Sequence, residues 1–325
     1  MEAELIKVGE LMRTYVNILL VLTIGLLMIG GTARADAAVK LRIGYPSGMN
    51  GQIVVVMEKT GIAKKYGINA EYTFFQNGPP MMQALTAGSI DAVITSLMPV
   101  TSYFSKQPGK AEIVAQLGAS SYSLMVPKGS DITNIKALRR KRIAVSFGTD
   151  SELDLLRSLS SVGLVPPKDV KLLNMPPDQL PLALRQGLAD AIVIRQPQVL
   201  RMQEQFSAKI VKTWPFRFVV IIRSDYLRKY PQLKNKFIAV LKDAVYYAAT
   251  HKEQASVWFG ERLRLDPKIV QRVTADDPIY QGVKRPEDVS VEITPGFRSI
   301  INKWFDNSYK FGMIKTKVKP LTVGP

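Results

Sequence analysis

The sequence predicts a two-lobed α/β protein, because one α/β template occurs twice along the chain. Residues 84–95 read ALTAGSIDAVIT and residues 183–194 read ALRQGLADAIVI. Each is the end of a helix, a turn glycine, an aspartate and an apolar strand. Residues 40–45 (KLRIGY) and 140–145 (RKRIAV) repeat at a similar spacing. So long a period indicates two copies of one unit rather than a solenoid. Two similar lobes predict a ligand cleft between them.

The first copy is predicted from alternating apolar residues, glycine stops and a proline-started helix. Its strands are expected at residues 39–45, 69–75 and 90–95, its helices at residues 51–60, 80–87 and 99–105, and an extended segment at residues 121–126.

The second copy follows the same order. Its strands are expected at residues 142–146, 170–174 and 190–194, and its helices at residues 151–162 and 178–186. A long apolar run at residues 216–223 would return the chain to the first lobe. Beyond it we expect helices at residues 231–250, 252–263, 267–273 and 295–311.

Two extended segments, residues 121–126 and 216–223, would cross between the lobes and form a two-segment hinge. Such a hinge permits closure on a ligand, with the rotation confined to few residues. Lobe one is then expected to comprise residues 36–122 and 217–325, and lobe two residues 123–216.

The first 35 residues are expected to be a signal peptide. An apolar run at residues 15–31 precedes Ala33-Arg34-Ala35, which fits the small-x-small cleavage rule. Translation could also begin at Met12, and an uncleaved membrane anchor is the rival interpretation. The chain has no cysteine, so a lipid-attached form is excluded and a periplasmic protein is expected.

Composition argues against catalysis and against metal or cofactor binding. Without cysteine, thiolate chemistry is excluded, and the single histidine, His251, cannot provide a two-histidine site or a triad. The formal net charge of +17 raises the possibility of nucleic-acid binding. However, the basic residues are scattered and not interleaved with aromatics, which favours a solvated basic surface that attracts anions. We expect no nucleic-acid partner, no cofactor and a monomer.

Four loops at strand ends are candidates for ligand binding. They lie at residues 46–51, 77–79, 95–98 and 148–151, and combine glycine, hydroxyl and amide groups with helix N-termini, which suit anions. Helix capping is the alternative for any one loop. Arg195 follows its strand as Ser96 follows the equivalent strand, so it would face the cleft, where it could hold an oxyanion, lie at the surface or pair with Asp150. The candidate ligand-binding residues are Tyr45, Ser47, Asn50, Asn77, Gly78, Thr95, Ser96, Ser121, Gly148, Thr149, Asp150, Ser151, Arg195 and Trp214.

Six segments resemble the substrate-binding proteins of ABC importers in the nitrate, sulfonate and taurine group, which share a fold with thiamine-precursor binding proteins. They are LRIGY at residues 41–45, GIAKKYGINAEY at 61–72, FQNGPPMMQALTAGSIDA at 75–92, LMVPKGSDI at 124–132, LRRKRIAVSFGT at 138–149 and GLADAIVI at 187–194.

The resemblance implies a type II periplasmic binding protein fold, a mixed α/β sheet in each lobe and delivery of a small solute to an ABC permease in the inner membrane. A thiamine-precursor-type heteroaromatic binder and a ligand sensor uncoupled from transport remain alternatives. The chain departs from the family pattern at Arg195-Gln196-Pro197, where an aromatic and an acidic residue are common, and at Asp150, where a neutral residue better suits an anion.

Overall fold

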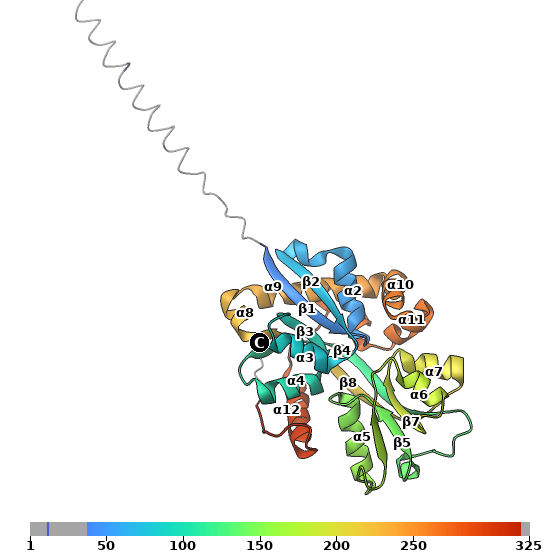
Figure 1. Ribbon diagram of the computed structural model, residues 1–325. Helices are drawn as coiled ribbons and strands as arrows, with labels where there is room; N and C mark the ends of the chain where they lie inside the picture. The colour runs from blue at the N-terminus through green and yellow to red at the C-terminus, as the bar shows by residue number, and fades with distance from the viewer. Residues whose placement is uncertain (1–11, 13–37, 320–325) are drawn as a thin grey trace, which may run out of the picture. The chain divides into compact units, whose positions relative to one another are not determined.

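The structure is a computed structural model that describes Met12 and residues 38–319 (Figure 1). The expected signal peptide and its cleavage site therefore lie outside the described residues, Met12 excepted. Within the described ranges, no helix combines the length and apolar character needed to cross a membrane.

The described part of the chain forms one eight-stranded sheet with the order β2-β1-β3-β8-β4-β7-β5-β6. Each half is mixed, as expected, because three parallel strands pair with one antiparallel long strand. The strands are β1 (Val39–Pro46), β2 (Ile68–Phe75), β3 (Ala92–Ser96), β4 (Ala111–Val126), β5 (Arg142–Val145), β6 (Lys171–Asn174), β7 (Ala191–Arg195) and β8 (Lys209–Arg223).

The repeated template forms the same arrangement in both halves. β1 lies between β2 and β3, and β5 lies between β6 and β7, all in parallel. The aspartates of the repeated template, Asp91 and Asp190, link the start of one strand to the neighbouring strand. Asp91 accepts hydrogen bonds from the backbone N–H, Nε and Nη2 of Arg42, and Asp190 accepts the same three from Arg142. These bidentate pairs give the aspartates a structural role.

Helices cover both faces of the sheet (Figure 1). They are α2 (Asn50–Thr60), α3 (Gly78–Thr86), α4 (Leu97–Lys106), α5 (Asp150–Ser161), α6 (Leu180–Arg185), α7 (Gln198–Phe206), α8 (Ser224–Lys229), α9 (Leu233–Thr250), α10 (Lys252–Leu263), α11 (Pro267–Ala275) and α12 (Pro295–Lys310), with short 3-10 turns at Ile62–Tyr66, Ile135–Leu138, Pro278–Tyr280 and Pro286–Asp288.

Alternating side chains of each strand feed cores on opposite faces. On β3, Ile94 packs into the core shared with α2 and α9, whereas Val93 packs into the core of α3, α4 and α12. Such a strand is buried on both sides, so its continuous apolar sequence is explained. Each fully buried valine or isoleucine contributes roughly 1.5–3 kcal/mol to folding.

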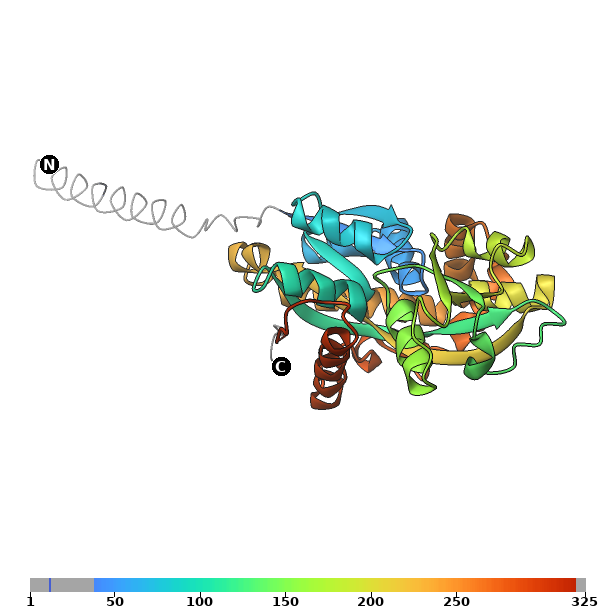
Figure 2. The ribbon, with the colours of Figure 1, turned by 60° about the horizontal axis from the view of Figure 1, so that its bottom comes forward.

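The crossing segments are longer than the sequence analysis predicted. Residues 121–126 and 216–223 lie inside the 16-residue β4 and the 15-residue β8, which run side by side through both halves (Figure 2). β3 pairs with β8 up to Phe218, and β7 pairs with β4 from Tyr122. Residues 119–121 and 215–217 thus pair only with each other. A register shift between Gln116 and Ala119 adjoins them. We take this stretch as the hinge.

The sequence patterns predict no element for the first ten residues of β4, for the first seven residues of β8, or for the helices α7 and α8. α7 is polar on one side and buries only Val199 and Met202. Two buried positions are too few to show a helical period in the sequence. The early part of β4 contains glycine and serine and is held by its long-range pairing with β8.

Candidate functional site

The candidate site lies where loops that follow β1, β3, β5 and β7 meet between the two lobes. Asp150, the first residue of α5, belongs to the expected lobe two. Its carboxylate accepts hydrogen bonds from the Ser96 hydroxyl and, at 3.3 Å, from the backbone N–H of Met98. Both donors belong to the N-terminus of α4, in lobe one. Asp150 therefore joins the lobes rather than capping its own helix.

Asp150 is 1% exposed, and this burial raises the pKa of its carboxyl to about 7, against the opposing effect of the Ser96 hydrogen bond. Desolvation disfavours the charged form of a carboxyl, whereas donors at a helix N-terminus favour it. The Asp150 carboxyl consequently holds its proton to a higher pH than an exposed aspartate does.

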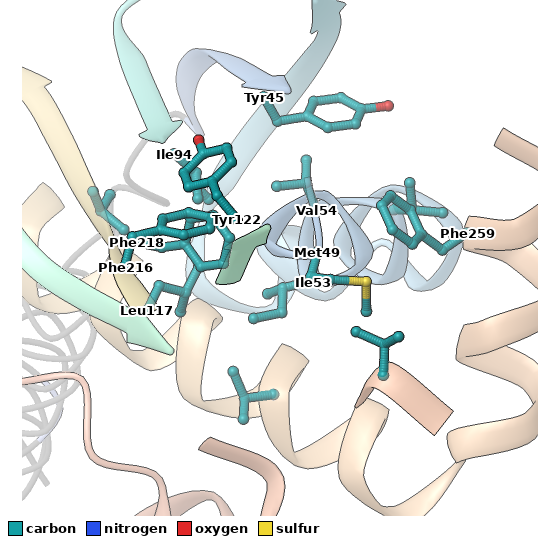
Figure 3. Packing of buried hydrophobic residues seen from close by; sticks show 14 of the residues in the cluster. Tyr45, Met49, Ile53, Val54, Ile94, Leu117, Tyr122, Phe216, Phe218 and Phe259 are labelled. Carbon is teal, nitrogen blue, oxygen red and sulfur yellow. The ribbon is translucent and has the colours of Figure 1, made fainter. Parts of the chain in front are cut away.

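Tyr122 lies beside the two charged candidates and was not predicted as a site residue. Its phenol lies close to Ser96, Asp150 and Arg195, and burial raises its pKa. The ring stacks on Phe216 with centroids 4.3 Å apart, as Figure 3 shows. The sequence signal that could have found Tyr122 was its position near the start of the expected extended segment, residues 121–126. In the structure Tyr122 pairs with Arg195 on β7.

Arg195, the last residue of β7, contacts the loops that follow β1 and β2. Its Nη2 donates to the Ser47 hydroxyl oxygen at 2.6 Å and to the Gln76 carbonyl at 2.9 Å. The Ser47 hydroxyl in turn donates to the same carbonyl at 3.0 Å. No hydrogen bond or ion pair joins Arg195 and Asp150 among the described residues, so the alternative of a direct pair is not observed.

A cavity of about 450 Å³ opens beside Arg195. Its lining comes from the loops after β1 and β2, from lobe two and from the end of α10. The lining residues are Ser47, Phe74, Gln76, Pro177, Asp178, Ile194, Arg195, Gln198, Arg262, Leu263 and Arg264. The volume suits a small organic ligand.

A second hollow between the lobes, of about 630 Å³, is more apolar. α3 and α4 form one side, and Phe147 and Gly148 form the other. Lys106 is its charged lining residue. Phe147 is 38% exposed and contributes to the wall of this hollow.

Asn50 and Asn77 both have buried amide oxygens without a partner among the described residues. The Nδ2 of Asn50 donates to the Ile94 carbonyl at 3.0 Å, and Asn77 precedes α3 without capping it. Gly78 packs so tightly on Pro99 that a Cβ would lie 2.1 Å from the proline Cγ. Glycine is thus required there by close approach rather than by a ligand.

The loop before α5 satisfies most of its own polar groups. Thr149 donates to the Ser146 carbonyl at 2.6 Å, and its hydroxyl lies 2.7 Å from that of Ser151. The Gly148 N–H donates to Glu152 at 2.6 Å. Gly148, at φ +72°, lies close to Pro79 of lobe one. The loop therefore contacts the other lobe through its backbone.

The remaining candidates are Trp214, Tyr45, Thr95 and Ser121. Trp214 is buried, and its indole N–H donates to Ser158 of α5 at 2.9 Å. Tyr45 packs edge-on against Phe74, with its hydroxyl directed away from Tyr122 (Figure 3). Burial raises its pKa to about 12. Thr95 is buried on β3, and the Ser121 carbonyl accepts the Gln196 N–H at 3.1 Å.

The model of the NMT1-like family matches residues 34–258. The chain belongs to the NMT1-like family. A Brucella abortus (strain 2308) relative, named "Putative binding protein BAB2_1146", is 24% identical over 316 residues, covering 93% of this chain and 94% of its own. A Bacillus subtilis relative, named "Putative aliphatic sulfonates-binding protein", is 27% identical over 243 residues, covering 72% and 73%.

Solved structures show the same fold. The alkanesulfonate-binding protein SsuA from Xanthomonas axonopodis pv. citri matches with a TM-score of 0.74 at 19% identity, covering 89% of this chain and all of that one. The nitrate-binding protein NrtA from Synechocystis PCC 6803 matches with a TM-score of 0.68 at 14% identity, covering 87% and 84%. The resemblance to ABC-importer binding proteins and the periplasmic-binding-protein fold are confirmed.

Proposed function

We propose that this chain is an extracytoplasmic solute-binding protein that delivers a small anionic or zwitterionic organic solute to an ABC permease. The names of its relatives support this proposal: one from Brachyspira hyodysenteriae is a "Putative ABC transporter periplasmic binding protein", and one from Escherichia coli is a "Putative aliphatic sulfonates-binding protein". In this proposal the protein is exported, loses residues 1–35 and acts as a monomer.

The observation that carries the proposal is the set of polar contacts between the expected lobes, residues 36–122 with 217–325 and residues 123–216. Asp150 contacts the start of α4, and Arg195 contacts the loops after β1 and β2. A third contact pairs Arg272 of α11 with Glu204 of α7 at 2.5 Å. Opposite charges at a junction of two lobes suit a solute that joins both lobes.

Ligand binding and lobe closure would be coupled through these contacts. A solute held by both lobes favours the closed arrangement, and it shifts the equilibrium only by its difference in affinity for the closed and open forms. Residues 119–121 and 215–217 would absorb the rotation, because they alone connect the two halves of the sheet. The permease would then receive the closed, loaded form.

A thermal-shift screen and solution scattering of the exported protein test this function. The screen compares sulfonates, nitrate, taurine and heteroaromatic thiamine-precursor analogues. We expect one class to raise the melting temperature and, at saturation, to reduce the radius of gyration. A saturating ligand that leaves the radius unchanged would contradict a transport cycle based on closure.

A further inference from the structure

We propose that the end of lobe two that lies furthest from lobe one binds the surface of an anionic lipid bilayer. Lysines would contact the headgroups there, and exposed apolar side chains would enter the interface. This surface, the basic end, comprises residues 127–142, 162–171, 187–190 and 209–210. The inference goes beyond the proposed function, because it concerns a surface outside the cleft between the lobes.

The sheet brings five strand ends together at the basic end. Arg142 of β5 pairs with Lys171 of β6, and Val126 of β4 pairs with Lys209 of β8. β7 lies between β4 and β5 and begins at the same level. Neighbouring strands lie about 4.8 Å apart, so the five ends form a row about 19 Å long.

This row faces away from lobe one. The loops that follow β5 and β7 contact lobe one, through Gly148 beside Pro79 and through Arg195. The starts of the same strands therefore lie at the opposite end of lobe two. Figure 2 shows the long strands β4 and β8 running out to this end. A flat surface could approach it without contacting lobe one.

The basic end carries positive charge that its own acidic residues do not neutralise. Its three acidic residues, Asp131, Asp169 and Asp190, each pair with a neighbouring lysine or arginine. Further basic side chains are exposed and form no ion pair with any described residue: Lys128, Arg140, Lys168, Lys171 and Lys209. These side chains remain available to lipid phosphates.

The equivalent end of lobe one shows that the fold does not require this charge. Arg42 takes the place of Arg142 there, and its partner on the neighbouring strand is Glu71, where lobe two has Lys171. Glu71 also forms an ion pair with Lys40 at 2.7 Å. The repeated unit thus tolerates an acidic residue at a position that is basic in lobe two. The excess charge belongs to the surface of lobe two and not to the repeated unit.

Three large apolar side chains are exposed at the same end. Val165, Leu188 and Ile210 are 57%, 51% and 40% exposed. Val165 precedes β6, Leu188 precedes β7, and Ile210 is the second residue of β8. Single exposed apolar residues are common on proteins. Three at one sheet end, among unpaired lysines, match surfaces that bind at a bilayer interface.

Hydrogen bonds hold two of these apolar residues beside charged ones. The N–H of Val165 donates to the Asp169 carboxylate at 2.9 Å, and its carbonyl accepts the Asp169 N–H at 2.8 Å. The Gly187 carbonyl, directly before Leu188, accepts from Nη2 of Arg142 at 2.8 Å. The apolar and basic groups therefore belong to one surface.

This combination favours a bilayer over a soluble polyanion. Lysines close to an anionic bilayer are attracted to its headgroups, and apolar side chains add the free energy of leaving water. An acidic polymer would engage the lysines alone. Residues 127–142 and 162–171 contain no aromatic side chain on which nucleobases could stack. Binding would keep the protein close to the membrane that holds its permease.

Vesicle co-sedimentation of the exported protein tests the proposal. Vesicles of phosphatidylcholine are compared with vesicles in which about a third of the lipid is phosphatidylglycerol. We expect binding to the anionic vesicles only. Binding should weaken as salt rises, because the Debye length falls from about 30 Å at 0.01 M to about 8 Å at 0.15 M.

A fourfold lysine variant removes charge from the basic end. Its substitutions are Lys128→Gln, Lys168→Gln, Lys171→Gln and Lys209→Gln. We expect it to bind anionic vesicles about a hundredfold more weakly or less. The matched control makes the same change at four exposed lysines of lobe one that have no ion pair with a described residue: Lys59, Lys64, Lys252 and Lys303. The control should bind as the unaltered chain does, and both variants should retain the melting temperature.

A second variant, Val165→Ser with Leu188→Ser and Ile210→Ser, separates a bilayer from a soluble polyanion. We expect it to bind anionic vesicles more weakly and polyglutamate no differently from the unaltered chain. Equal losses in the two lysine variants, or equal binding to phosphatidylcholine, would overturn the proposal. Vesicle binding that ignores the apolar substitutions would assign the surface to a soluble polyanion instead. All variants share one N-terminus, so residues 15–31 do not affect the comparison. Solute binding in the thermal-shift screen tests the proposed function separately.

Discussion

Replacing Asp150 by asparagine should stabilise the protein more at pH 8 than at pH 5. The carboxyl has an ordinary pKa of 3.8 and a pKa of about 7 in the folded protein, raised mainly by burial. Between these values the folded state holds a proton that the unfolded state has released. The stability of the unaltered protein therefore falls as pH rises from about 4 to about 7, and stays low above that range.

The size of the effect follows from the pKa difference. One pKa unit corresponds to about 1.4 kcal/mol, so charging buried Asp150 destabilises the closed fold by up to about 4 kcal/mol. Opening of the lobes would hydrate the carboxylate and reduce this cost. An asparagine Oδ1 can still accept from the Met98 N–H, and its Nδ2 can donate to the Ser96 hydroxyl oxygen, so the variant can keep a polar contact with both residues of α4. At pH 5 about 1.6 kcal/mol of this cost is already present, so we expect the advantage of the asparagine variant to be about 2–3 kcal/mol smaller at pH 5 than at pH 8.

Urea unfolding of both proteins from pH 5 to pH 8 measures this difference directly. Asp154, whose pKa burial raises to about 6, titrates in both proteins, so the comparison isolates Asp150. Asp277→Asn is a control. Burial also raises the pKa of Asp277 to about 6, but its carboxylate accepts from the backbone N–H of Ala119 in the hinge rather than from α4. A stability difference for Asp150→Asn that is the same at every pH would refute the reasoning.

Three further outcomes are expected. Asp91→Asn should destabilise the fold by about 1–3 kcal/mol, because it removes the charge that pairs the buried Asp91 carboxylate with the Arg42 guanidinium, whose side chain is 33% exposed. Asp190→Asn should cost less, since the Asp190 side chain is 30% exposed against 1% for Asp91. Equal losses in thermal unfolding would contradict this difference. Gly78→Ala should lower the melting temperature, because its Cβ would overlap Pro99, and an unchanged value would show that α3 can move. Intact-mass analysis of exported protein should show cleavage after Ala35; full-length protein in the membrane fraction would exclude it.

The fold was largely predictable because its signals are local. Gly61 ends α2 in the left-handed conformation at φ +66°, as a glycine stop predicts. The repeated template predicted that the strands β1 and β3 are equivalent to the strands β5 and β7, and the two pairs match in the structure. The extent of β4 was not predictable, because Gly118, at φ +77°, and the serines that follow it are held in the strand by pairing with β8.

The site was predictable where it depends on strand ends. Ser96 and Arg195 both lie at the lobe junction because each ends an equivalent strand. Tyr122 and Arg264 were missed, since the side chains around them come from distant parts of the chain. Trp214 illustrates the converse: an aromatic near a strand end packs into the core of lobe two.

Lobe closure on an anion that Arg195 helps to hold is tested most directly by a distance measurement. The chain has no cysteine, so spin labels can be attached at Lys59→Cys on lobe one and Gln186→Cys on lobe two, both at exposed positions. The anion that the thermal-shift screen selects should shorten the label-to-label distance. In the Arg195→Ala variant, the label-to-label distance should not shorten at the same anion concentration. An unchanged distance at saturation, or equal shortening in Arg195→Ala, would contradict the account.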